Sequence, residues 1–483
     1  MTDNIYCIPE KHYYRLHHVR PRFKDNVEDV LYFMSQNIYM LGEKSNSEFK
    51  NSLNNFIKRF PGNQNHADKT INNWRTEISA LFGLIQYRPG FSRPSALSER
   101  LAKNSDLIEF FKYFLYYFQY PGGHLKSHVV CDMLLNNIKF KPVKYILLVM
   151  LEGGKINQNI DFGINQAECT HCIFNDLRAT TGVRSPNETA NLIINNRARK
   201  YDYITDGDVV RYAGDILDYM VLADLIRIRP NNKYYINGHQ MEAIEKFIKS
   251  EEYFTPYDNF SHANISASNI SALENQWFNY VNNINKLTFE SDFNTVIEMF
   301  ANDELDNDLS NSSSNNTFTK EVIDKLRLID GKKTTKEIGD IGESLVLEHE
   351  QIRLTTIDQL YKQKCKSLLK KIPSQFAVGY DIASLEGVGD MRRYIEVKTT
   401  MSMGKLSSRS FHLTPSEWSA AQSLKDTYYI YRIMISKNDI SLFEIKDPVN
   451  KYKKDLINLM ISNGVDVNYS EKSGEYQKLL VKL

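Results

Sequence analysis

One segment constrains the fold of this chain more than any other: Ala301–Lys320, with the sequence ANDELDNDLSNSSSNNTFTK. It is rich in Asn, Ser and Asp, and it holds too few apolar residues to offset the entropy lost on ordering. We therefore predict an acidic Asn/Ser linker over residues 301–320. Residues 321–483 are then a block of single-domain size, and residues 1–300 are long enough for two further domains.

The composition describes an ordinary globular protein. The 483 residues carry a formal net charge of +1, and 42% of them are hydrophobic. The longest apolar run, Tyr145–Leu151, is far shorter than the ~20 residues needed to span a bilayer. The N-terminus lacks the apolar core of a secretory signal, and the five scattered cysteines fit a reducing compartment. We expect a cytoplasmic protein without a membrane partner.

Helical patterns dominate the chain before the linker. A helix is predicted over Ser105–Tyr120, where the dense aromatic run favours a core over a base-stacking surface. A second helix begins with the capping box Ser185–Glu188, which has Pro186 at its first position, and runs to about Asn196. A third is predicted over Asp206–Asp224. We expect a helical, winged-helix-like DNA-recognition region over residues 1–140.

Two short strands around a Pro-Asn-Asn turn are predicted over Leu225–Asn237, directly after the third helix. Helices followed by a β-hairpin are typical of a winged helix, so residues 141–300 are interpreted as a winged-helix-like DNA-binding region with a helical connector. An alternative is a helix–hairpin packing unit with solvated charges. The cations expected to contact DNA phosphates are Arg197, Arg199, Lys200, Arg211, Arg227, Arg229 and Lys233.

Two other groups of residues in this half could bind a metal or nucleic acid. Cys169 and Cys172 have CxxC spacing, but structural zinc needs four ligands and no second pair follows nearby. His12, His17 and His18 lie in a basic and aromatic stretch that could touch nucleic acid, although a solvated N-terminal arm is the favoured interpretation.

After the linker, the pattern predicts an α/β domain with a mixed sheet in the order αβββαβ. The expected elements are a helix over Asp340–Arg353, strands over Gln375–Ile382, Arg393–Thr399 and Ser410–Leu413, a helix over Pro415–Leu424, and strands over Tyr428–Ile435 and Ser441–Ile445. The helix over Pro415–Leu424 has a well-marked start, because Thr414 and Glu417 have capping-box spacing.

Three ionisable residues stand out on the first two of these strands. Glu396 and Lys398 point to one face because side chains alternate along a strand, and Asp381 lies beside them if the strands form a hairpin. Two converging carboxylates suit a hard cation such as Mg²⁺, with Mn²⁺ as a substitute, and a nearby ammonium can orient water or offset developing negative charge. This pattern predicts a phosphodiester hydrolysis site. A purely structural ion pair stays open, because Glu444 and Lys446 show the same spacing.

These residues resemble a known family. GDIGESLVLEHEQIRL, GYDIASLEGVGDMRRYIEVKTT and FHLTPSEWSAAQSLKDTYYIYRI, within 339–435, resemble the NO VEIN C-terminal type domain, which is grouped with the PD-(D/E)XK nuclease superfamily. The resemblance implies that residues 321–483 are a nuclease domain in which Asp381, Glu396 and Lys398 are catalytic. It also implies that Glu343 assists the metal, although Glu343 could instead complete a capping box from Asp340. Tyr380 replaces the proline of the superfamily's name.

The N-terminal half more faintly resembles the recognition parts of restriction or nicking endonucleases. Together these patterns predict an Mg²⁺-dependent, sequence-specific restriction-type endonuclease that acts on double-stranded DNA in phage defence. The resemblance to the nuclease superfamily implies a product with a 5′-phosphate. A single active site per chain implies a homodimer or sequential nicks for a double-strand break, and the sequence does not decide between them; a cognate DNA methyltransferase is the further expected partner. The alternatives are a non-catalytic nucleic-acid-binding subunit of a defence complex and a winged-helix transcription regulator. The recognised sequence and the response to DNA methylation are not readable from the chain.

Overall fold

The structure is a computed structural model that describes residues 4–158, 161–289, 338–357, 368–373, 377–387, 391–407, 409–437, 439–462 and 464–481. The chain divides into two compact units. Unit 1 consists of Met1–Val27, Gly42–Glu99 and Ile108–Phe289, and unit 2 of Glu28–Leu41, Arg100–Leu107 and Glu290–Leu483. The predicted linker over 301–320 lies outside the described residues. Within the described residues, no helix has the length and apolar character needed to cross a membrane.

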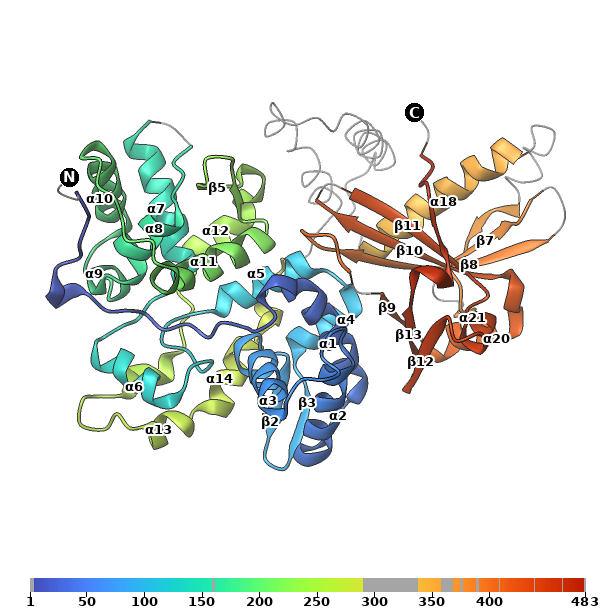
Figure 1. Cartoon of the computed structure of the whole chain (residues 1–483), viewed down its shortest axis with the longest axis horizontal. Coiled ribbons are helices and arrows are strands. Elements are labelled where there is room, and N and C mark those ends of the chain that lie inside the picture. Colours follow the sequence, from blue (N-terminus) through green and yellow to red (C-terminus); the bar gives the residue numbers. More distant parts are fainter. Residues whose placement is uncertain are drawn as a thin grey trace. The chain divides into compact units, whose positions relative to one another are not determined.

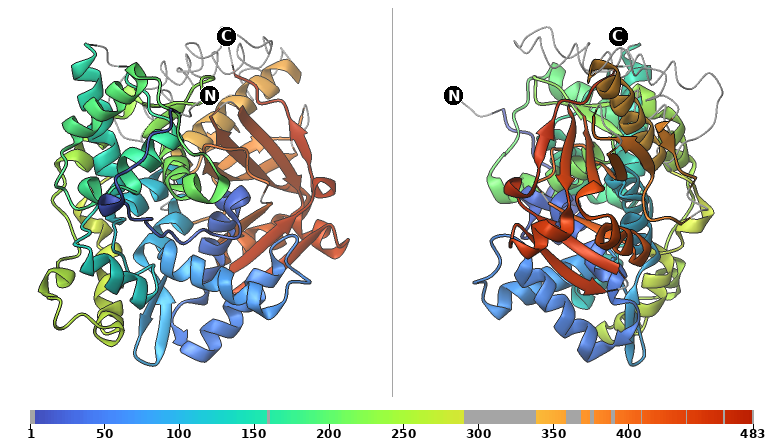
Figure 2. Two further views of the ribbon diagram at one scale, coloured as in Figure 1. Left: turned by 60° about the vertical axis from the view of Figure 1, so that its left-hand side comes forward. Right: turned by 90° about the vertical axis from the view of Figure 1, so that its right-hand side faces the viewer.

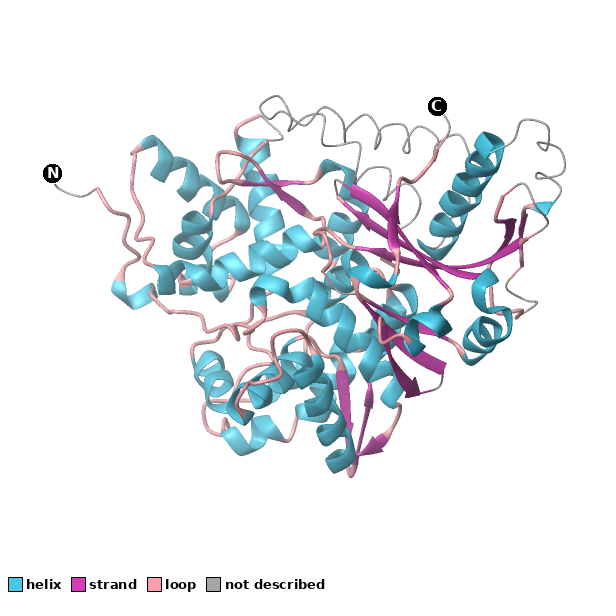
Figure 3. Ribbon diagram, turned by 45° about the vertical axis from the view of Figure 1, so that its right-hand side comes forward, coloured by secondary structure: helices cyan, strands magenta, loops and turns pink. Residues whose placement is uncertain are grey.

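Unit 1 is mainly helical, as the sequence predicts for this half of the chain (Figures 1 and 3). Its described helices are α2 (Asn46–Arg59), α3 (Asp68–Thr76), α5 (Leu107–Tyr117), α6 (Ser127–Leu135), α7 (Pro142–Ile156), α8 (Gln166–Cys169), α9 (Leu177–Thr180), α10 (Pro186–Ala198), α11 (Gly207–Leu222), α12 (Met241–Lys249), α13 (Ala267–Ser271) and α14 (Glu274–Val281); α4 (Ala96–Asn104) crosses the unit boundary. Its described strands form a small antiparallel sheet of β1 (Lys44–Ser45), β3 (Phe91–Pro94) and β2 (Ile85–Arg88), and a hairpin of β4 (Ile226–Ile228) and β5 (Tyr234–Ile236).

Helix α5 forms the aromatic core of unit 1, as its sequence predicts. Phe111, Tyr113 and Tyr117 are almost fully buried, so the base-stacking alternative is wrong for these rings. The helix begins two residues later than predicted because Ser105 adopts a left-handed backbone conformation with φ of 53°. Such a conformation interrupts the helical ladder, and Ser105 does not act as the N-cap.

The region of the predicted wing follows the expected order of elements. Helix α10 begins with the predicted capping box, in which Ser185 and Glu188 each accept a hydrogen bond from the other's backbone. Helix α11 and the β4–β5 hairpin come next, with Ile226 opposite Ile236. Helices and hairpin are therefore confirmed as elements, and their arrangement as a winged helix stays a prediction.

The N-terminal segment packs into unit 1 instead of forming a solvated arm. Leu16 and His18 are buried, and the hydroxyl of Tyr120 lies 2.9 Å from Nδ1 of His18. The expectation of a solvated arm is wrong because apolar and aromatic positions alternate with the charges in this stretch and are drawn into the core.

Unit 2 is built on a mixed sheet. Its described strands lie in the order β14 (Glu475–Gln477), β11 (Asp439–Lys446), β10 (Tyr428–Ser436), β8 (Arg392–Met401), β7 (Ile382–Leu385) and β6 (Lys370–Lys371). Strands β8 and β10 are parallel and the other neighbours antiparallel, so the predicted mixed sheet is confirmed. A second antiparallel sheet contains β12 (Ile457–Ser462), β13 (Gly464–Tyr469) and β9 (Ser410–Leu413). The helices assigned to unit 2 include α1 (Val27–Leu41), α18 (Ile338–Ile357), α20 (Pro415–Leu424) and α21 (Pro448–Lys453).

Two sequence expectations for unit 2 are wrong. Strand β9 belongs to the second sheet and not to the mixed sheet, because it pairs with β13, which the sequence analysis did not anticipate. The strand predicted over Gln375–Ile382 begins only at Ile382. Its described residues before that point include Ala377 and Gly379, both with positive φ, and such a conformation cannot continue a strand.

The mixed sheet carries helix α18 on one face and helix α20 on the other (Figures 1 and 2). Gly342 of α18 lies directly over Thr399, whereas Glu417 of α20 contacts Lys398. Neighbouring residues of β8 therefore serve opposite faces, as strand geometry requires.

Candidate active site

Asp381 lies beside strand β8 because the β7–β8 hairpin brings it there. Its backbone N–H donates to the carbonyl of Ile395 at 2.9 Å, and its Oδ2 accepts a hydrogen bond from the N–H of Val397 at 2.8 Å. The antiparallel register, with Ile382 opposite Ile395, places Asp381 next to Glu396. Glu396 lies on β8 and Asp381 directly precedes β7, so the hairpin brings them together as the sequence predicts, although Asp381 is not itself on a strand.

Lys398 lies between two carboxylates. Its Nζ is 2.7 Å from Oε1 of Glu396, two residues earlier on β8, and 2.7 Å from Oε2 of Glu417 on α20. The Glu396 side chain is only 5% exposed and that of Lys398 is 20% exposed. The structure therefore brings together Asp381, Glu396 and Lys398.

Burial controls the electrostatics of this group. It raises the pKa of Asp381 to about 6, and the charge of Glu343 adds to the effect. It also raises the pKa of Glu396 well above its usual range, although Lys398 opposes the shift. For Lys398 burial alone would lower the pKa, but Glu396 and Glu417 outweigh it and raise the value. The ammonium is therefore charged at neutral pH and suits electrostatic stabilisation rather than base catalysis.

Glu343 lies on α18 and pairs with a different lysine. Its Oε2 is 2.7 Å from Nζ of Lys371 on β6, which is also 3.1 Å from Oδ1 of Asp340. The alternative that Glu343 completes a capping box from Asp340 is wrong, because Asp340 already lies inside α18. Glu343 is near enough to Asp381 to influence its pKa, but its ion pair is with Lys371.

Glu417 belongs to this group although the sequence analysis assigned it only a helix start. It is the third residue of α20, and its Oε2 also accepts a hydrogen bond from the backbone N–H of Thr414 at 3.0 Å. Burial would raise the pKa of Glu417, but Lys398 and the capping hydrogen bonds lower it, so this carboxylate is ionised. The motif F-x-LT-x-x-E contained the residue, but only the folded chain shows its contact with Lys398.

Two carboxylates of this group, Asp381 and Glu396, are hard oxygen donors of the kind that Mg²⁺ takes. Asp381, Glu396 and Glu417 bring three carboxylates to one ammonium, which leaves a surplus of two negative charges when all are ionised. Among the described residues, no group of three or more His, Cys, Asp and Glu side chains is arranged to hold a metal ion. Two carboxylates with water and phosphate oxygens are nevertheless a common magnesium environment. Asp381 and Glu396 are the residues that would hold it.

Three of the seven cations predicted to contact DNA form ion pairs inside unit 1. The pairs are Arg197 with Glu168, Arg227 with Asp224, and Arg229 with Asp161. Arg197 makes a bidentate contact with a carboxylate whose side chain is 3% exposed, and its guanidinium covers the ring of Phe162. The pair with the buried Glu168 gives Arg197 a structural role that does not require DNA.

The other predicted cations lie nearer the surface. Arg199 and Lys200 are exposed just after α10, where their carbonyls accept hydrogen bonds from Nδ2 of Asn4. Arg211 is exposed on α11, and Lys233 is partly exposed beside the β4–β5 turn. Their contacts with DNA stay predictions.

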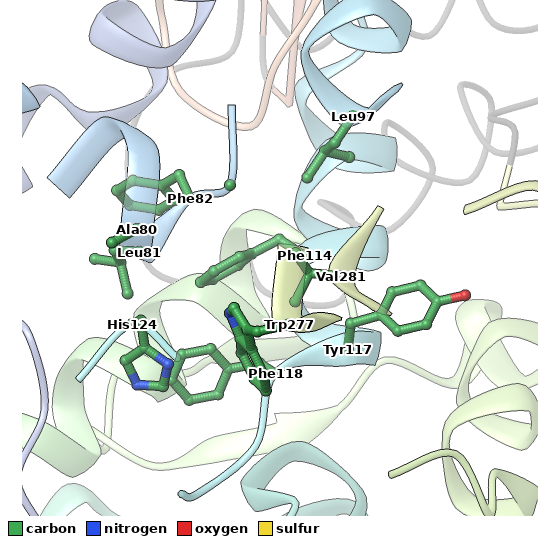
Figure 4. Close-up of a pocket in the computed structure, with 11 residues that line it drawn as sticks. Ala80, Leu81, Phe82, Leu97, Phe114, Tyr117, Phe118, His124, Trp277 and Val281 are labelled. Carbon is green, nitrogen blue, oxygen red and sulfur yellow. The ribbon is translucent and has the colours of Figure 1, made fainter. Parts of the chain in front are cut away.

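Unit 1 also contains a small pocket lined mainly by aromatic and aliphatic side chains (Figure 4). His124, Phe118 and Trp277 lie together along it, with ring centroids of His124 and Phe118 4.7 Å apart. Burial lowers the pKa of His124 well below its usual range, so the ring is neutral. The pocket is a mainly aromatic part of the core.

Cys169 and Cys172, the pair with CxxC spacing, are buried free thiols of unit 1.

Comparisons with known proteins match the N-terminal and the C-terminal parts of the chain to different families. Residues 6–278, more than half of the chain, match the family model of the restriction endonuclease BpuJI N-terminal region, and residues 342–445 match that of the C-terminal region of the protein NO VEIN. A solved structure of the BpuJ1 endonuclease binding domain, in complex with pyrene- and phenanthrene-modified DNA, is similar at 23% sequence identity and a TM-score of 0.50; the match covers 58% of this chain and all of that one. This likeness shows a shared fold. None of the curated proteins matches the chain.

Proposed function

Because the chain belongs to the family of the restriction endonuclease BpuJI N-terminal region, we propose that it is a sequence-specific restriction-type endonuclease. In this proposal, residues within 6–278 recognise double-stranded DNA. Residues within 342–445, which match the NO VEIN C-terminal model, carry a PD-(D/E)XK-type site that hydrolyses phosphodiester bonds. Specific cutting needs one part that reads DNA and one that cleaves it, and the two matched regions do not overlap.

The convergence of Asp381, Glu396 and Lys398 is the observation that carries the proposal. Burying ionised groups costs several kcal/mol each, and their mutual attraction recovers this only when the charges balance. Here carboxylates outnumber the ammonium, and the raised pKa values of Glu396 and Asp381 mean that the group disfavours full ionisation without a further cation. A structural ion pair needs no surplus carboxylate, whereas a site that accepts a cation and a phosphate does.

Each residue has a distinct proposed role. Asp381 and Glu396 would hold Mg²⁺, with Mn²⁺ as a substitute, because both are hard oxygen donors. When bound, the cation supplies an acidified water and positive charge next to the phosphate. Lys398 donates hydrogen bonds from its ammonium to the attacking water or to a phosphate oxygen, which offsets the negative charge that develops. Glu343 holds Lys371 and adds negative charge near Asp381. The resemblance to the superfamily implies a product with a 5′-phosphate.

The proposed partners follow from one such site per chain. A single site cuts one strand at a time, so we propose a homodimer for double-strand cleavage. A cell that holds such an enzyme needs a DNA methyltransferase that protects its own sites, and the natural setting is phage defence in the cytoplasm.

The test is cleavage of plasmid and phage DNA with Mg²⁺. The wild-type protein should yield discrete fragments, whereas Lys398→Ala and an EDTA control should leave the DNA intact. Lys405→Ala is the matched control, because Lys405 is a lysine of the same unit whose side chain is 72% exposed and which pairs with Asp439. It should cut like the wild type.

Two outcomes would contradict the proposal. Intact DNA combined with a gel shift would favour the non-catalytic DNA-binding subunit or the transcription regulator. Equal cleavage by wild type and Lys398→Ala would remove Lys398 from the site.

A further inference from the structure

The ammonium of Lys398 is shared by carboxylates from two different elements. Glu396 lies on the same strand, and Glu417 reaches it from α20, each at 2.7 Å. Glu417 is not a strand neighbour of Lys398, because 19 residues separate the two along the chain. The contact exists only because α20 packs on this face of the sheet.

Glu417 is held in place through both its carboxylate and its backbone N–H. Its Oε2 accepts a hydrogen bond from the N–H of Thr414, and its own N–H donates to Oγ1 of Thr414 at 3.3 Å. This capping box fixes the carboxylate at the start of the helix. The start of α20 is in turn packed against the turn before Asp381, where a Cβ on Gly379 would come within 2.5 Å of the carbonyl oxygen of Ser416. The start of the helix that carries Glu417 thus packs against the turn that leads into Asp381.

The two carboxylates have different neighbours. Glu396 adjoins Asp381, the second proposed cation ligand, whereas Glu417 is engaged with Thr414 and Lys398. A cation held by Asp381 and Glu396 competes with Lys398 for the charge of Glu396, because both are positive. Lys398 then needs another anchor close to the site, and Glu417 is already in contact with it.

We propose that Glu417 is a positioning residue that keeps the Lys398 ammonium in place while Glu396 binds a divalent cation. The inference rests on the proposed function, since it assumes that Asp381 and Glu396 are the cation ligands. Besides Asp381, Glu396 and Glu343, it adds a carboxylate whose role is to hold the lysine and not the metal.

The experiment uses the full chain with Glu417→Gln. Glutamine keeps the capping hydrogen bonds at this position but removes the charge. Lys398 should then rest on Glu396 alone and oppose cation binding, so the affinity for Mg²⁺, measured by calorimetry without DNA, should fall about tenfold or more. Turnover with DNA should fall while the KM for DNA stays unchanged.

Glu444→Gln is the matched control. Glu444 is a glutamate of the same mixed sheet with a similar side-chain exposure of 15%, and it pairs with Arg393 instead of Lys398. Its removal should leave the Mg²⁺ affinity within about twofold of the wild-type value, since Glu444 is paired with Arg393 and is not among the charges that act on Glu396 or Lys398. Melting temperatures of both variants establish that each is folded.

The outcomes separate this inference from the proposed function. If the wild type binds Mg²⁺ and cuts DNA but Glu417→Gln binds Mg²⁺ equally well, the role of Glu417 is refuted and the nuclease remains. An equal loss of affinity in Glu444→Gln would also refute it, because any buried charge would then have the same effect. A wild type that neither binds Mg²⁺ nor cuts DNA overturns the proposed function and this inference with it.

Discussion

Replacing Gly342 with alanine should force helix α18 away from strand β8. A Cβ at this position would approach Cβ and Cγ2 of Thr399 to 2.9 and 3.0 Å, and Oγ1 more closely still, whereas ordinary contacts begin at 3.4 Å. Overpacking of this kind costs about 2–3 kcal/mol, and alanine returns about 1 kcal/mol of helix propensity. We expect a net loss of about 1–2 kcal/mol in the free energy of unfolding of unit 2.

The same substitution should reduce DNA cleavage without removing a charge. Glu343 follows Gly342 directly, so a helix that moves outward carries Glu343 and its ion pair with Lys371 away from Asp381. Denaturant unfolding followed by fluorescence measures the stability, and the plasmid assay measures cleavage. Both readouts should worsen together.

Gly339 supplies the matched control for this prediction. It lies in the same helix, and a Cβ there would meet none of the described residues within 4 Å. Gly339→Ala should therefore stabilise the protein by about 0.5–1 kcal/mol through helix propensity alone. If Gly342→Ala proves as stable as Gly339→Ala, the close packing of α18 on β8 is refuted.

Two further predictions concern unit 1. Arg197→Ala should lower the free energy of unfolding by about 3 kcal/mol because it leaves the buried Glu168 without its partner. Arg199→Ala on the surface should change it by no more than about 0.5 kcal/mol. Thermal unfolding compares the two variants, and equal melting temperatures would contradict the structural role of Arg197. Burial, with a smaller effect of Arg20, lowers the pKa of His18 from 6.5 to about 3. Because the pKa of His18 is lower in the folded state, the unfolded state binds a proton below pH 6.5 that the folded state does not. The free energy of unfolding therefore keeps its full value above pH 6.5 and decreases as the pH falls towards 3, by about 2 kcal/mol at pH 5. His18→Gln should flatten the pH dependence of stability in this window, and an unchanged slope would show that His18 is not buried as a neutral ring.

Local patterns in the sequence predicted several elements of the fold. The capping box at Ser185 and the one at Thr414 mark the starts of α10 and α20, and the predicted bounds Pro415–Leu424 are those of the structure. A cap involves residues three positions apart, so its energy is decided within one turn of helix. The strand over Ser410–Leu413 was likewise recognised from its own residues.

Such local patterns could not predict contacts between residues that are far apart in the sequence. Strand β9 joins the second sheet because β13, more than fifty residues later, offers it a partner. His18 is buried because Tyr120 and its neighbours surround it, and Arg197 pairs with Glu168, which lies 29 residues earlier in the chain. None of these partners can be identified from spacing along the chain.

The candidate site shows the same division. By itself the sequence determined that Glu396 and Lys398 share one face, since two residues on a strand must, and it marked Asp381 as a neighbour for them. Only the tertiary structure decided that Glu417 completes the surroundings of Lys398 and that Glu343 pairs with Lys371. The reason is physical: alternation along a strand is a property of the backbone, whereas the partner of a charge depends on which helices pack against the sheet and how closely.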